Sequence, residues 1–157
     1  MIGRRQRVSL HPYVPRALTA AARRSEPKET GGLLLGWTDG GIIVVRHALE
    51  VPDPSATQTS WTRSETRANE ALTKWLSEAA HPWLGYVGDW HAHPAPVGAS
   101  TTDKRCLKKD SRVTQKSLVL IVHRSDETLD VLTAQRGSAA RTTLITYEEI
   151  NQKDQTS

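Results

Sequence analysis

Two histidines and an aspartate in the middle of the chain are the residues best suited to chemistry. His91 and His93 stand two positions apart, and Asp103 follows ten positions later. Side chains alternate along an extended segment, so this spacing puts both imidazoles on the same side. Asp103, one turn into the helix expected next, can supply a third ligand. Two histidines and one carboxylate leave the fourth position of a tetrahedral Zn²⁺ open, as in catalytic zinc sites.

A zinc hydrolase also needs a general base, and Glu29 is the best candidate for it. Glu29 directly precedes the run Thr-Gly-Gly-Leu-Leu-Leu-Gly-Trp, so its carboxylate is expected at the mouth of a buried strand. A bound metal brings the pKa of water to about 7, and a carboxylate can then take its proton near neutrality. Taken alone, Glu29 would more often be a solvated loop residue, and a lone His-x-His pair more often belongs to a core or a surface.

Two further polar residues near this segment have alternative interpretations. Asp89 is expected on the same strand face as His91 and could orient that imidazole from behind, as second carboxylates at metal sites do. A solvated strand residue is the other interpretation. Ser100 can cap the helix that starts beside it. The tryptophans are interpreted as packing residues rather than substrate platforms, with Trp90 on the opposite strand face in the core.

The elements that must position these residues follow from hydrophobic periodicity and breaker residues. Helices are expected over 15–24, from a cap formed by Thr62 and Glu65 to Ala79, and from Ser100 to about Ser111. Apolar and β-branched runs predict strands over 31–37, 41–49, 83–90, 117–123, 129–133 and 141–146. An Asp39-Gly40 turn joins the first two strands into a hairpin.

Length and composition limit the kind of protein that carries these residues. A chain of 157 residues is the size of one domain, and 37% hydrophobic residues suffice for a core. The net charge of +4 allows an acidic partner but, without clustered arginines and aromatics, does not indicate nucleic acid. Cys106 is alone, and no apolar run approaches the roughly 20 residues of a membrane helix. We therefore expect a cytoplasmic protein that binds neither nucleic acid nor membrane.

The ordered set of candidate residues resembles the JAMM (JAB1/MPN/Mov34) metalloprotease family, in particular its short prokaryotic members. The resemblance covers about residues 8 to 146 and rests on Glu29-x-Gly31-Gly32 with Leu33, Leu35 and Gly36, then His91-x-His93-Pro94, Ser100 and Asp103. It implies a JAB1/MPN-like α/β fold, a mixed curved β-sheet flanked by helices on both sides in three layers like cytidine deaminase. The domain would span 1–150, followed by a polar tail over 151–157.

The resemblance also implies a role for each matched residue. His91, His93 and Asp103 would bind one Zn²⁺, Glu29 would deprotonate the attacking water, and Ser100 would stabilise the oxyanion with the metal. Family members without these ligands are structural scaffolds, whereas this chain retains all of them. There is one departure from the pattern. The family usually has one more residue between the second histidine and the serine than the six found here, Pro94 to Ala99.

The activity implied is cleavage of the amide bond after the C-terminal glycine of a ubiquitin-like protein or its conjugate. Compact members of this kind resemble the deconjugating peptidases of bacterial CBASS and Bil anti-phage operons. The alternatives are a processing peptidase for sulfur-carrier proteins of the ubiquitin fold and a non-catalytic MPN interaction scaffold. The partner would place its C-terminal tail in a groove beside the zinc. The sequence leaves open which ubiquitin-like protein this is, whether an isopeptide or a linear bond is cut, and the oligomeric state.

Overall fold

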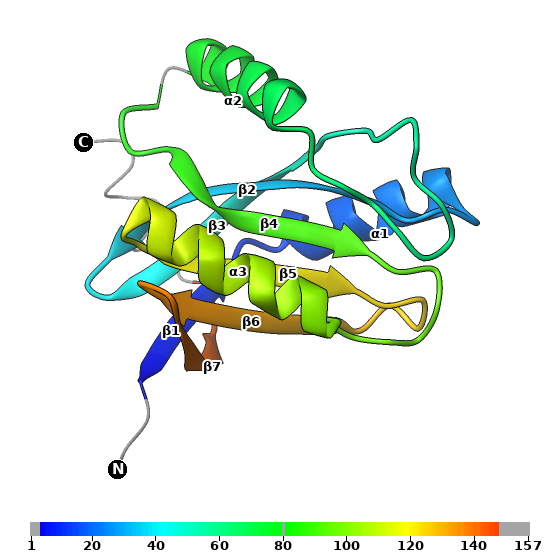
Figure 1. The fold of residues 1–157 in the computed structure, drawn as a ribbon. Coiled ribbons are helices and arrows are strands. Elements are labelled where there is room, and N and C mark those ends of the chain that lie inside the picture. Colours follow the sequence, from blue (N-terminus) through cyan, green and yellow to red (C-terminus); the bar gives the residue numbers. More distant parts are fainter. Residues whose placement is uncertain (1–3, 80, 148–157) are drawn as a thin grey trace.

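The computed structural model describes residues 4–79 and 81–147, which fold into strands and three helices (Figure 1). The strands are β1 (Arg5–Leu10), β2 (Thr30–Asp39), β3 (Ile42–Glu50), β4 (Gly85–Ala92), β5 (Ser117–His123), β6 (Leu129–Gln135) and β7 (Ser138–Ile145). The helices are α1 (Tyr13–Ser25), α2 (Glu65–Ala79) and α3 (Thr101–Thr114). The helices are inserted after β1, after β3 and after β4, and the remaining strands follow one another directly.

The strands form a closed barrel in the order β1-β3-β2-β4-β5-β6-β7. The expectation of a mixed curved sheet flanked by helices on both sides in three layers is therefore wrong. The closure comes from β7, which runs parallel to β1 with Arg5 opposite Arg141 and Ser9 opposite Ile145. The missed element is β1 itself. Its sequence, Arg-Gln-Arg-Val-Ser-Leu, buries the polar Gln6 and Ser9 beside Val8, so it lacks the hydrophobic alternation that identifies a strand.

The interior of the barrel is filled partly by α1. Val14, Leu18 and Ala21 of this helix are buried in one cluster with inward-facing residues of five strands. These strand residues are Val8, Leu34, Ile43, Val45, Val87, Trp90, Ala92, Val119 and Ile121. Trp90, which is 1% exposed, is a core residue as expected, and its indole N–H donates to the Leu49 carbonyl.

The other two helices lie on the outside of the barrel. Helix α3 lies across β5 and β6 in Figure 1, and Leu107 packs on residues of the outer strand face that include Leu118, Leu120 and Val122. These leucines alternate with the inward-facing Val119 and Ile121, as strand geometry requires. Helix α2 stands further from the sheet and has Ala68 as its only buried residue.

The connection β4–α3–β5 brings the candidate site residues to one end of the barrel. Strands β4 and β5 are parallel, so the chain must return along α3 from the C-terminal end of β4. The two histidines at that end and Asp103 in the first turn of α3 are therefore neighbours. Strand β2 runs antiparallel to β4 with Gly31 opposite His91, so the start of β2 lies at the same end.

Two local details differ from the expectations. The hairpin turn between β2 and β3 is centred on Gly40 and Gly41, whose φ angles of 55° and 79° suit a primed turn, rather than on Asp39-Gly40. Helix α2 is capped by Ser64, which accepts the Arg67 N–H on its hydroxyl. Ser64 takes the capping role expected of Thr62, and the Glu65 carboxylate is bound by the neighbouring Arg63.

Two remaining expectations concern the ends of the chain and membranes. The tail expected over 151–157 lies outside the described residues. Within the described ranges, no helix is long and apolar enough to cross a membrane.

His47 of β3 makes the stability of the fold sensitive to mild acid. Its ring lies 4.4 Å from the Trp75 ring of α2, and burial, together with the nearby Arg46, lowers its pKa from 6.5 to about 4. The folded state therefore holds His47 neutral while the unfolded chain protonates it, so stability is lost as the pH falls from 6.5 through 4. The slope of the unfolding free energy against pH reports how many protons the chain takes up on unfolding. In EDTA, His47→Gln should reduce this number by up to one over this pH range. Urea denaturation from pH 7.5 to 4.5 measures this, and parallel plots would contradict it.

Candidate metal centre

Four side chains from three segments meet at the end of the barrel where β4 and α3 join. The His91 Nδ1 lies 3.2 Å from Asp103 Oδ1, and the His93 Nε2 lies 3.6 Å from Asp103 Oδ2. The Glu29 Oε1 is 3.7 Å from the same His93 nitrogen. The four side chains are only 8–14% exposed. Thus the three residues expected as ligands, and the residue expected as the base, share one nearly buried site.

The orientation of His93 is set by the loop that follows β4. Its Nδ1 lies 3.2 Å from the Val97 carbonyl, which assigns the proton to Nδ1 and turns the lone pair of Nε2 toward Asp103 and Glu29. Asp130 holds the end of this loop by accepting the Ala99 N–H at 2.8 Å. The loop is therefore tied down although it is one residue shorter than in the family pattern.

Asp103 is positioned by the capping of α3. Its Oδ2 accepts the Ser100 N–H at 2.9 Å, while the Ser100 hydroxyl accepts the Asp103 N–H at 3.1 Å. Burial acts to raise the pKa of Asp103, but hydrogen bonds from His91 and Ser100 lower it to about 2. The carboxylate is therefore charged at neutral pH. Ser100 is the helix N-cap, and its O–H remains available as a donor because the hydroxyl so far only accepts.

Glu29 reaches the site through the pairing of β2 with β4. Thr30 pairs with Ala92, so the preceding residue on one strand lies beside the following residue on the other, which is His93. The Glu29 N–H is bound by the Thr57 carbonyl at 2.7 Å, which fixes the backbone just before the strand. Burial raises the pKa of the Glu29 carboxyl, opposed by His93 and His91. A carboxylate held in this way accepts a proton more readily than a solvated one.

Asp89 binds different partners from the one expected. Its Oδ2 lies 2.6 Å from Arg63 Nη1, and its Oδ1 accepts the Tyr86 hydroxyl at 2.8 Å. The same guanidinium contacts Asp110 on α3 at 3.3 Å and Glu65 at 2.7 Å. The structure shows no hydrogen bond from Asp89 to His91. Asp89 instead belongs to an arginine-centred cluster that ties β4, α3 and the start of α2 together.

Sequence reasoning missed Arg63 and the position of Trp61. Arg63 lies within the expected helix cap, and its partners Asp89 and Asp110 are distant in the sequence, so only the fold reveals the cluster. Trp61 is buried as a packing residue, and its ring lies 5.0 Å from the His91 ring. It also explains Gly31, where an added Cβ would lie 2.9 Å from the Trp61 ring and 2.7 Å from the Trp90 carbonyl oxygen. Trp61 thus supports one imidazole from the side.

The donor set fits Zn²⁺. One ligand atom from each of His91, His93 and Asp103 lies within 4.8 Å of the others, a spread that small side-chain movements can close around one ion. Imidazole nitrogen and carboxylate oxygen are usual zinc ligands, and three protein ligands leave a position free for water or substrate. Glu29 stands beside this set and would face that free position.

Comparisons with known proteins support the family resemblance and the fold. Residues 11–142 match the family described as prokaryotic homologs of the JAB domain. Among solved structures, the chain is similar to protein DSY2949 from Desulfitobacterium hafniense, with a TM-score of 0.65 and 19% sequence identity. That match covers 91% of this chain and 96% of the other, so the two share a fold over nearly their whole length. No curated protein matches the chain.

Removing a ligand should abolish zinc binding. His93→Ala and Asp103→Ala should reduce the metal content from roughly one zinc per chain to near zero, since either leaves two ligands. Both should also lose the stabilisation by zinc, which is about 2.7 kcal/mol in the unaltered protein when zinc is 100 times its Kd and which raises the melting temperature. Elemental analysis and thermal melts measure the two effects. Cys106→Ser is the control, because this thiol lines a small cavity together with His91 and Asp103 and should not affect zinc binding. Normal zinc content in both alanine variants would show that these residues do not bind it.

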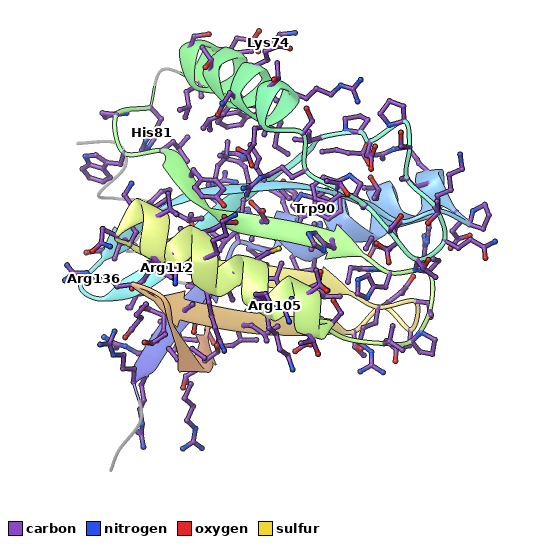
Figure 2. All side chains as sticks on the ribbon, viewed as in Figure 1. Lys74, His81, Trp90, Arg105, Arg112 and Arg136 are labelled. Atoms are coloured by element: carbon purple, nitrogen blue, oxygen red, sulfur yellow. The ribbon has the colours of Figure 1, made fainter. Side chains whose placement is uncertain are left out.

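Removing the charge of Arg63 should destabilise the fold. Arg63→Met leaves the carboxylates of Asp89 and Asp110 without their cation, and we expect the free energy of unfolding to fall by about 3 kcal/mol at pH 7.5. The loss should shrink toward pH 5, since protonation relieves carboxylates that have lost their counter-charge. Urea denaturation compares this variant with Arg105→Met, a control at an exposed position of α3 (Figure 2). Equal stability of the two variants would mean that the cluster contributes nothing.

Proposed function

The chain belongs to the family of prokaryotic homologs of the JAB domain, and we propose that it is a zinc-dependent peptidase. Its reaction is hydrolysis of the amide bond after the C-terminal glycine of a ubiquitin-like protein or of its conjugate. The observation that carries the proposal is the convergence of Glu29 with His91, His93 and Asp103 in one nearly buried site. A non-catalytic scaffold needs neither a ligand set that leaves one coordination position of the metal open nor a general base beside it.

His91, His93 and Asp103 would hold the zinc. When bound there, zinc supplies a Lewis acid that polarises the scissile carbonyl and lowers the pKa of water. The protein contributes the fixed arrangement of the ligands. The Val97 carbonyl orients His93, the capping of α3 holds Asp103, and Trp61 packs beside His91.

Glu29 moves the proton. As the water oxygen attacks the carbonyl carbon, the Glu29 carboxylate accepts one of its protons. The carbon–nitrogen bond then breaks, and the same proton passes to the departing amine, leaving a new carboxylate on the ubiquitin-like protein. The Ser100 hydroxyl donates to the oxyanion, which is compatible with its capping role because capping uses only its acceptor.

The burial of the site supports a glycine tail as the substrate. His93 and Glu29 are 8% and 10% exposed, and the Trp61 ring covers His91 from one side. Only a thin, extended segment can bring its carbonyl next to these groups. A tail ending in glycines has no side chains to exclude, whereas bulkier tails would collide with the walls. The setting in a CBASS or Bil anti-phage operon is part of the same proposal and rests on the resemblance to compact deconjugating peptidases.

Replacing Glu29 separates metal binding from catalysis. Glu29→Gln should retain zinc and lower kcat by about 100- to 10,000-fold, the usual contribution of a general base. The substrates are ubiquitin-like proteins with C-terminal extensions beyond Gly-Gly, assayed by mass spectrometry with and without a zinc chelator. Sulfur-carrier proteins of the ubiquitin fold are assayed in parallel.

The outcome also separates the alternatives. Cleavage of the sulfur carriers alone would favour the processing peptidase. Zinc-loaded protein that cuts none of the substrates would favour the non-catalytic scaffold. Full turnover by Glu29→Gln would remove this residue from the role of base.

A further inference from the structure

A second hollow lies at the end of the barrel opposite the metal centre. Its volume is about 730 Å³, and it is lined by residues at the β2–β3 turn, the start of β4, the α3–β5 connection and the β6–β7 turn. Gly85 lines it, and Gly85 and His91 are six positions apart on β4, which at about 3.3 Å per residue is about 20 Å. We refer to this hollow, walled by Trp37, Trp83, Lys116 and Arg136, as the tryptophan cleft.

The aromatic wall of the tryptophan cleft is held rigidly. Trp37 is 8% exposed and stacks on His81 with ring centres 5.9 Å apart and an angle of 10° between the planes. The Trp83 ring meets the His81 ring edge-on, with ring centres 6.0 Å apart, and the backbone N–H of Trp83 donates to His81 Nδ1. Trp83 is nevertheless 43% exposed. An indole whose backbone is held in this way and which stays partly exposed can act as a stacking platform for a flat ring.

Two cationic side chains, Lys116 and Arg136, also line the cleft. Lys116 and Arg136 are both exposed, and the Arg136 N–H reaches the Lys116 carbonyl at 3.4 Å, so the two side chains start close together. Neither side chain forms an ion pair or hydrogen bond with any residue that the structure describes. Figure 2 places Arg136 at the same end of the barrel as His81. Two unpaired cations in the same cleft as an exposed indole are suited to an anion that carries a ring.

We propose that the tryptophan cleft binds a nucleoside monophosphate or a small aromatic anion of that kind. The ring stacks on Trp83, and the phosphate is bound by Lys116 and Arg136. A ring alone would leave the cations unpaired, and inorganic phosphate alone would leave the indole exposed, so the two parts should bind better joined than apart. Asp39 also lines the cleft and can accept a hydrogen bond from an amino group on the ring.

The test compares the joined ligand with its parts. In isothermal titration calorimetry of the full chain in EDTA, AMP or GMP should bind at least about 10-fold more tightly than the matching nucleoside or inorganic phosphate. Trp83→Ala should weaken binding of the nucleotide by roughly 10-fold or more, while Trp83→Phe, which keeps a ring, should retain most of the affinity. Lys116→Ala and Arg136→Ala should each weaken it by roughly 10-fold.

Matched controls make a negative result decisive. Lys74→Ala removes an exposed lysine of α2 that lies away from the cleft and should leave affinity unchanged (Figure 2). No saturable binding of any nucleoside monophosphate up to about 5 mM would overturn the proposal. Equal affinities for AMP and inorganic phosphate, or nucleotide binding that survives both Trp83→Ala and Lys116→Ala, would overturn it as well. Because the cleft is remote from the zinc ligands, none of these results bears on the peptidase proposal.

Discussion

The carboxylate of Asp103 is the group on which the candidate metal centre depends. One of its oxygens accepts the Ser100 N–H and faces the His93 Nε2, and the other faces the His91 Nδ1. The same side chain therefore starts α3 and joins the two imidazoles. Without it, the helix would lose a cap and the histidines would lose the anion between them. The candidate metal centre and the beginning of the helix are thus one structural unit.

The location of this unit follows from topology more than from local chemistry. A parallel crossover places the end of β4 beside the start of α3, and antiparallel pairing of β2 brings Glu29 to the same end of the barrel. Arg63 links β4 and α3 at a second point, where it binds Asp89 and Asp110. The opposite end of the same strands forms the tryptophan cleft, so one barrel separates an anionic site from a cationic one.

The residues of the candidate metal centre could be predicted from the sequence, because their signals were local. The two-residue spacing of His91 and His93 on a strand and the capping motif of Ser100 and Asp103 require only neighbouring residues. The barrel could not be predicted, because its closure depends on pairing between chain segments far apart and on β1, whose buried Gln6 donates to the Gly41 carbonyl across the sheet. The contact of Asp89 with Arg63 was missed for the same reason: Arg63 stands 26 positions away. Long-range polar contacts leave no periodic signal in the sequence.

The most direct measurement is the position and coordination of zinc in crystals of the zinc-loaded protein. Anomalous diffraction at the zinc absorption edge should give one strong peak between β4 and α3. That peak should have two nitrogen ligands and one carboxylate oxygen at about 2.0–2.2 Å, from His91, His93 and Asp103. Glu29 should lie outside this shell, close to the remaining position. A peak elsewhere on the barrel, or Glu29 as a direct ligand in place of Asp103, would contradict the account.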